Sequence, residues 1–114
     1  MAAPSTPGYD QLFQALADPY RRGFIEQLSR GPATVTALAE PAAVGLPAVL
    51  KHLRILEQGG IVVSAKVGRV RTYRMQPEAF GAIKGWIAQR EAEMNQAFDR
   101  LEALMHDIPE AEQP

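Results

Sequence analysis

The residues with the clearest chemical potential in this sequence are six basic side chains between Gly45 and Met75. They are Lys51, Arg54, Lys66, Arg69, Arg71 and Arg74, and the segment contains one acidic residue, Glu57. The segment therefore has a net charge of +5, whereas the whole chain carries −1 at pH 7. Ammonium and guanidinium groups gathered in this way attract anions, and the regular phosphate array of duplex DNA is the partner that this pattern favours.

The spacing of these bases places the first two on a helix. Residues 46–58 have helical periodicity, and Gly59-Gly60 ends the segment. The apolar face of this helix consists of Leu46, Val49, Leu53 and Leu56. The residues predicted to contact DNA from this helix are Pro47, Ala48, Leu50, Lys51, His52 and Arg54. A solvated helix face is the alternative for the two bases. Leu50 either meets a thymine methyl group or packs on the preceding helix. His52 lies near the border of the apolar face, and three roles are open for it: a packed ring, a pH-sensitive group or a DNA contact.

The remaining bases lie on a predicted β-hairpin. Two valine-rich alternating segments, residues 61–66 and 70–75, read as strands, with residues 67–69 at the tip. The predicted DNA contacts in this wing are Lys66, Arg69 and Arg71, which would grip backbone phosphate or the minor groove. The alternative is that these charges protect an edge strand from aggregation.

Four further helices are expected around these two elements. They span residues 9–17, residues 19–30 after an Asp18 cap, residues 35–40, and about 28 residues from Pro77 onward. The last one carries an apolar stripe longer than a DNA-binding core needs, which predicts a second copy as its partner. The predicted dimer interface is Leu12, Phe13, Phe80, Ile83, Ile87, Met94, Phe98 and Leu101. A ligand pocket lined by Phe80, Trp86 and Phe98 is the alternative use of this stripe.

Composition narrows the function classes. The chain has 114 residues, 46% of them hydrophobic, and no Cys. No segment predicts a signal peptide or a membrane span, so we expect a cytoplasmic protein with one domain at 9–106 and disordered tails at 1–8 and 107–114. No nucleophile–base pair or phosphate loop predicts catalysis, so the chain is not expected to be an enzyme.

Three segments together resemble the ArsR (ArsR/SmtB) family of prokaryotic transcriptional repressors. These segments are FQALADPYRRGFIEQLSRGP at 13–32, LPAVLKHLRILEQGGIV at 46–62 and VGRVRTYRM at 67–75. The resemblance implies an α+β, mostly helical fold: a winged helix-turn-helix with a two-stranded β-hairpin wing and a long C-terminal dimerisation helix. It further implies a homodimer whose first and last helices form the interface, and whose recognition helices (residues 46–58) enter successive major grooves.

The sequence departs from the family's metal-sensing pattern. Known sites in the family use Cys on the third helix, or Asp and His on the last helix. Here the third helix lacks Cys and the last helix has only His106. We therefore expect no metal and no cofactor, and a small-molecule effector remains open.

The predicted function is a sequence-specific, homodimeric repressor that binds an inverted-repeat DNA operator. The alternative is a winged-helix module for protein–protein contact without specific DNA binding. Salt-dependent binding to duplex DNA distinguishes the two.

Overall fold

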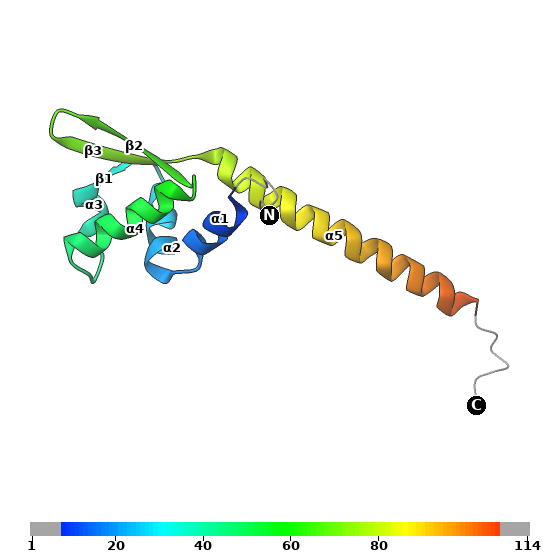
Figure 1. Ribbon diagram of the computed structural model, residues 1–114. Coiled ribbons are helices and arrows are strands. Elements are labelled where there is room, and N and C mark those ends of the chain that lie inside the picture. The colour runs from blue at the N-terminus through cyan, green and yellow to red at the C-terminus, as the bar shows by residue number, and fades with distance from the viewer. Residues whose placement is uncertain (1–7, 108–114) are drawn as a thin grey trace, which may run out of the picture. The chain divides into compact units, whose positions relative to one another are not determined.

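The computed structural model describes residues 8–107, and these residues divide into two compact units, with the boundary between Phe80 and Gly81. The elements in order are α1 (Tyr9–Leu16), α2 (Pro19–Leu28), β1 (Ala33–Thr34), α3 (Val35–Ala39), α4 (Leu46–Gln58), β2 (Val62–Val67), β3 (Val70–Met75) and α5 (Pro77–His106) (Figure 1). The predicted fold class, a mostly helical winged helix-turn-helix with a long C-terminal helix, is confirmed. Apart from Gly8 and Asp107, the tails predicted to be disordered lie outside the described residues.

Local sequence explains where the helices of the first unit begin and end. Asp18 caps α2, as predicted, because its carboxylate accepts a hydrogen bond from the backbone N–H of Arg21 at 3.1 Å. Thr34 caps α3 in the same way, through the N–H of Ala37. The helix α4 ends at Gln58, and Gly60, two residues further on, lies in the left-handed region (φ 75°), where the N–H of Ile61 donates to the carbonyl of Leu56 at 3.0 Å. This reversal leads directly from α4 into β2.

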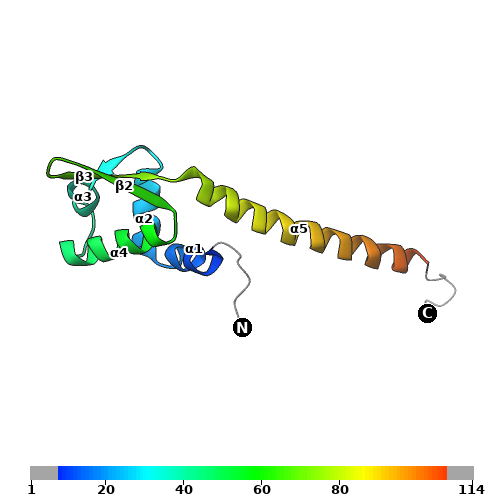
Figure 2. The same cartoon turned by 45° about the horizontal axis from the view of Figure 1, so that its top comes forward.

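The sheet has three strands in the order β1-β3-β2, all antiparallel (Figures 1 and 2). β2 and β3 form the predicted wing, paired from Val62↔Met75 to Val67↔Val70. The two-residue strand β1 was not predicted. Ala33 pairs with Tyr73 and Thr34 with Thr72, so β1 covers the edge of β3 beside the start of α3.

The core of the first unit lies between the helices and the buried ends of the sheet. Its largest fully buried side chains are Leu38, Val49, Leu53, Leu56, Ile61 and Val62. Three of the four residues assigned to the apolar face of α4 are among them. The fourth, Leu46, is 52% exposed, because it is the first residue of the helix and extends past the core. Leu12, expected in an interface between copies, is 5% exposed and belongs to this core.

The helix α5 is the longest element, at 30 residues. All described residues after Arg90 are exposed, including the apolar side chains Met94, Phe98, Leu101 and Met105. In residues 8–107, no helix is both long enough and apolar enough to cross a membrane.

Candidate nucleic-acid interface

The exposed face of α4 presents two cations that form no ion pair with any other described residue. Lys51 and Arg54 are exposed, one turn apart, on the side opposite the buried Val49, Leu53 and Leu56. Within residues 8–107, neither Lys51 nor Arg54 has a hydrogen bond or an ion pair through its side chain. An exposed cation that is held on a rigid helix without a partner can bind an external phosphate or base edge.

Apolar and small side chains surround these bases at the start of the helix. Pro47 and Leu50 are exposed and Ala48 is partly exposed, with Leu50 at 39%. Leu50 is therefore accessible, as the thymine-contact hypothesis requires. The start of α4 and the tip of the wing formed by β2 and β3 lie at the same end of the first unit in both views (Figures 1 and 2).

The wing ends in a two-residue turn. Val67 pairs with Val70, so Val67 belongs to β2 and the tip is Gly68-Arg69, one residue shorter than predicted. Gly68 has φ 64°, a conformation that glycine adopts without strain at the first position of such hairpin turns. Lys66 and Arg69 are exposed and, in the described part of the chain, their side chains have no hydrogen-bond or ion-pair partner.

The third predicted wing contact, Arg71, differs from the other two. Its Nη1 donates to Oγ of Ser64 at 2.8 Å, and that hydroxyl donates to Oε2 of Glu57 at 3.1 Å. This chain of hydrogen bonds joins β3 to β2 and to the C-terminal end of α4. Beside it, burial raises the pKa of Tyr73, and the negative charge of Glu57 raises it further. Glu57, the single acid of the basic segment, thus braces the wing against α4.

His52 faces the protein. Its ring stacks on Tyr20 with centroids 5.7 Å apart and lies 6.3 Å from the ring of Phe24. Its Nδ1 lies 3.1 Å from Nη1 of Arg21 and 3.8 Å from Oδ2 of Asp18. The packed-ring hypothesis therefore describes this side chain in the structure, and a DNA contact would require it to move.

Sequence reasoning missed Arg21. The residue is 9% exposed, although basic residues near a helix start usually face solvent. Its Nε donates to the carbonyl of Ala15 and its Nη2 to that of Gln14, both at 2.9 Å. The last carbonyls of a helix lack N–H partners within that helix, so a basic side chain a few residues further along the chain can bind them. The position of Arg21 shortly after α1 was the one sequence signal for this contact.

The described residues contain no group of three or more His, Asp or Glu side chains able to hold a metal ion. His106, the residue considered for metal binding, lies 3.8 Å from Oε1 of Glu102, and both are exposed.

Comparison with known proteins agrees with this geometry. A helix-turn-helix domain family matches residues 16–65. The HTH-type transcriptional regulator Rv2034 of Mycobacterium tuberculosis is 37% identical over 75 residues, which cover 66% of this chain and 70% of that protein. The crystal structure of an ArsR family transcriptional regulator, RHA00566, is 41% identical with a TM-score of 0.76, and the match covers 82% of this chain and 97% of that one. An ArsR-like transcriptional regulator from Rhodococcus sp. RHA1 has the same TM-score at 27% identity, over 88% of this chain and 97% of its own.

Proposed function

This chain belongs to the ArsR family of winged helix-turn-helix regulators, and from this premise we propose that it is a homodimeric repressor of a DNA operator. One observation carries the proposal: Lys51, Arg54, Lys66 and Arg69 are exposed cations without a protein partner in the described residues, and all lie on the recognition helix or the wing. In a chain with a net charge of −1, four cations that are free within the described residues thus lie together on the two elements that a winged helix offers to DNA.

The recognition helix supplies the sequence readout in this proposal. Lys51 and Arg54 reach base edges in the major groove, where donor groups pair with the O6 and N7 acceptors of guanine. Leu50 and the start of the helix, at Pro47 and Ala48, offer apolar contact to thymine methyl groups. His52 supports the helix from within, through Tyr20 and Arg21, and contacts DNA only if its ring turns outward.

The wing supplies sequence-independent affinity. Lys66 and Arg69 neutralise phosphates next to the major-groove site, and each neutralised phosphate releases counterions. Arg71 contributes less directly than the sequence predicted, because its guanidinium already donates to Ser64.

Dimerisation sets the form of the operator. The apolar stripe of α5 lies exposed: Ile87 is 45% exposed, Met94 and Leu101 are each 53% exposed and Phe98 is 65% exposed. Paired with a second copy, this stripe, with Phe13, Phe80 and Ile83, would close a two-fold interface. Leu12 is left out because it lies in the core. Two recognition helices then lie about 34 Å apart, so the operator is an inverted repeat with half-site centres about 10 base pairs apart. Such a regulator works where the chromosome is, in the cytoplasm.

The test is binding to the intergenic duplex next to the protein's own gene, measured by fluorescence anisotropy at several salt concentrations. We expect log K to fall linearly with log salt, with a slope of about −0.9 for each phosphate neutralised. Lys51→Ala should weaken binding, whereas the control Lys84→Ala, an exposed lysine on α5, should leave it unchanged.

The second candidate function is a protein-interaction module. It is favoured by the same apolar stripe on α5, which would then dock on a different chain. Absence of any salt-dependent duplex binding in the wild-type protein would replace the DNA proposal with this one.

A further inference from the structure

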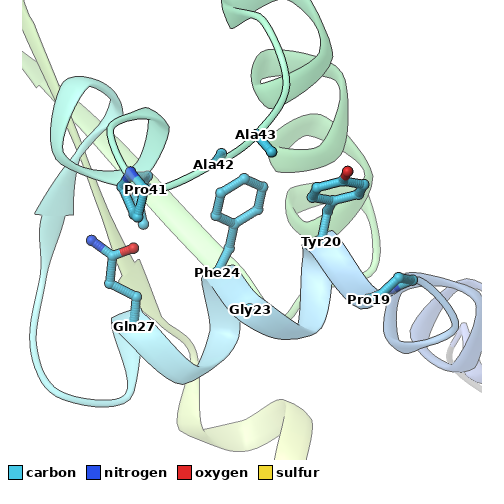
Figure 3. Close-up of a pocket in the computed structure, with 9 residues that line it drawn as sticks. Pro19, Tyr20, Gly23, Phe24, Gln27, Pro41, Ala42 and Ala43 are labelled. Atoms are coloured by element: carbon cyan, nitrogen blue, oxygen red, sulfur yellow. The ribbon is translucent and has the colours of Figure 1, made fainter.

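A cavity of about 310 Å³ lies within the first unit, between α2, α3 and the turn that leads into the recognition helix. Figure 3 shows Tyr20, Phe24 and Gln27 projecting from α2 toward the turn, which contributes Pro41, Ala42 and Ala43. None of its nine lining residues, all of them described, carries a charged side chain. An occupant of this cavity is therefore uncharged.

The size and walls of the cavity select a flat occupant. A cavity of about 150 Å³ holds one benzene ring, so this one accommodates an aromatic system of about two fused rings. Tyr20, 40% exposed, supplies an aromatic face for offset stacking, Phe24 lines the cavity beside it, and the proline and alanine side chains of the turn supply a low apolar wall opposite them. The floor is open above Gly23, where an added Cβ would meet no atom within 4 Å.

Gln27 provides the polar contact. Its Nε2 donates to the carbonyl of Ala37 at 3.1 Å, which fixes the orientation of the amide. In Figure 3 the amide oxygen lies on the side of Phe24, and within the described residues it accepts no hydrogen bond. A ligand with one N–H or O–H donor would satisfy it.

The walls of this cavity also hold the recognition helix. Tyr20 stacks on His52 of α4 at 5.7 Å, and Phe24 lies 6.3 Å from the same ring. The turn at residues 41–43 leads into α4 within three residues. An occupant that presses on Tyr20 and on this turn therefore acts on two of the segments that contact or lead into the recognition helix.

We propose that the cavity between α2 and the 41–43 turn is an effector site for an uncharged bicyclic aromatic molecule with a single N–H or O–H donor. The occupant lowers DNA affinity by displacing His52 and the start of α4. The site itself stands on the cavity, whereas the effect on DNA rests on the proposed function.

Indole is the probe for the site, and its binding is measured on the full chain without DNA by calorimetry and by shifts in amide NMR resonances. We expect a dissociation constant of about 0.1 mM, with shifts centred on Tyr20, Gly23, Gln27 and Ala42. Benzofuran has the same shape but lacks the N–H, so it should bind roughly tenfold more weakly because Gln27 is left unpaired. No binding up to about 2 mM indole, or equal affinity for the two molecules, overturns the proposal.

A variant that fills the cavity gives the second test. Gly23→Leu should reduce indole affinity about tenfold or more, since its side chain occupies the ligand's space. Gly85→Leu is the matched control on α5, where an added Cβ also meets nothing within 4 Å. Equal losses in the two variants, or none in Gly23→Leu, overturn the site. If Gly23→Leu does not fold, the comparison of indole with benzofuran on the wild-type protein decides.

The effect on DNA is measured separately. Saturating indole should weaken duplex binding about fivefold or more, and the duplex should weaken indole binding by the same factor. If indole binds and duplex affinity is unchanged or higher, the coupling is wrong although the site stands. If the protein alone binds no duplex, the proposed function fails, and this outcome is independent of indole.

Discussion

Nη1 of Arg21 lies 3.1 Å from Nδ1 of His52, and this contact joins α2 to the recognition helix. A guanidinium has only donors, so in this contact Nδ1 of His52 is the acceptor. The same guanidinium satisfies two carbonyls at the end of α1, those of Gln14 and Ala15. One buried cation therefore fixes three helices relative to one another.

Loss of Arg21 should destabilise the first unit strongly. Arg21→Met removes all three hydrogen bonds of the side chain. The carbonyl of Gln14 keeps the N–H of Ala17, but the contacts to the Ala15 carbonyl and to His52 are lost, so we expect a loss of about 2 kcal/mol or more in urea unfolding. Arg21→Lys should recover little of it, because an ammonium cannot reproduce the planar fork. The control is Arg22→Met: Arg22 is exposed, with one side-chain bond to the carbonyl of Leu16, and should cost less than about 0.5 kcal/mol. Similar losses in Arg21→Met and Arg22→Met would contradict this account.

Asp18 should make stability depend on pH on the acid side. Desolvation alone would raise its pKa, but the N–H of Arg21, His52 in its protonated form and the guanidinium of Arg21 hold the pKa of Asp18 below its ordinary value. Because the folded pKa is depressed, the stabilisation is complete above the unfolded pKa and is lost as pH falls through the folded pKa.

The two functions of Asp18 are separable by substitution. Asp18→Asn should keep the helix cap while flattening the fall in stability between neutral pH and about pH 3, and Asp18→Ala should cost about 1 kcal/mol even at neutral pH. Urea unfolding across this range checks both. Asp10→Asn, in the first turn of α1, is the control. An unaltered acid profile in Asp18→Asn would show that the carboxylate contributes as a cap alone.

The periodicity of apolar residues was sufficient to predict most of the helices and strands from the sequence. The bounds of α4 and β3 agree with the predicted residues 46–58 and 70–75, and in α4 the buried Val49, Leu53 and Leu56 recur with the helical period. The strand β1 escaped detection because two residues have no period, and its identity depends on Tyr73 and Thr72, almost forty positions away.

The exposed residues of the candidate site could be predicted from the sequence, whereas the hydrogen bonds that hold the wing against α4 could not. Lys51, Arg54, Lys66 and Arg69 stand out as unbalanced charge in the sequence alone. The contact of Arg71 with Ser64, and of Ser64 with Glu57, exists only once the hairpin folds back beside the end of α4. A charge count treats Arg71 as equivalent to Arg69, whereas the structure shows that one guanidinium is engaged and the other is free among the described residues.

The apolar stripe of α5 should control assembly. Phe98→Glu places a charge in the middle of this stripe, where Phe98 is 65% exposed, and should convert the dimer to monomer at about micromolar concentrations. Gln96→Glu is the control with the same added charge, because at 100° per residue position 96 lies on the opposite side of the helix. Sedimentation velocity distinguishes the species. A wild-type protein that sediments as a monomer would remove the dimer from the proposal.

Variants of the recognition helix should change sequence preference, whereas variants of the wing should change affinity for all duplexes alike. Lys51→Ala and Arg54→Ala remove groups placed to reach base edges, so each should weaken operator binding by roughly 1–3 kcal/mol and binding to random duplex by less. Arg69→Ala removes a phosphate contact, so it should weaken both duplexes about equally and reduce the salt slope by about one phosphate per subunit.

The measurement is anisotropy titration of operator and random duplexes across a series of salt concentrations. Arg30→Ala, an exposed arginine at the end of α2, controls for the loss of one positive charge outside the proposed surface. Arg71→Ala should lower DNA affinity indirectly, because loss of the Ser64 contact loosens the wing. It should therefore also lower the melting temperature of the protein. Arg69→Ala should leave the melting temperature unchanged. An Arg69→Ala variant with unaltered affinity and salt slope would mean that the wing does not touch DNA, and the readout would then belong to α4 alone.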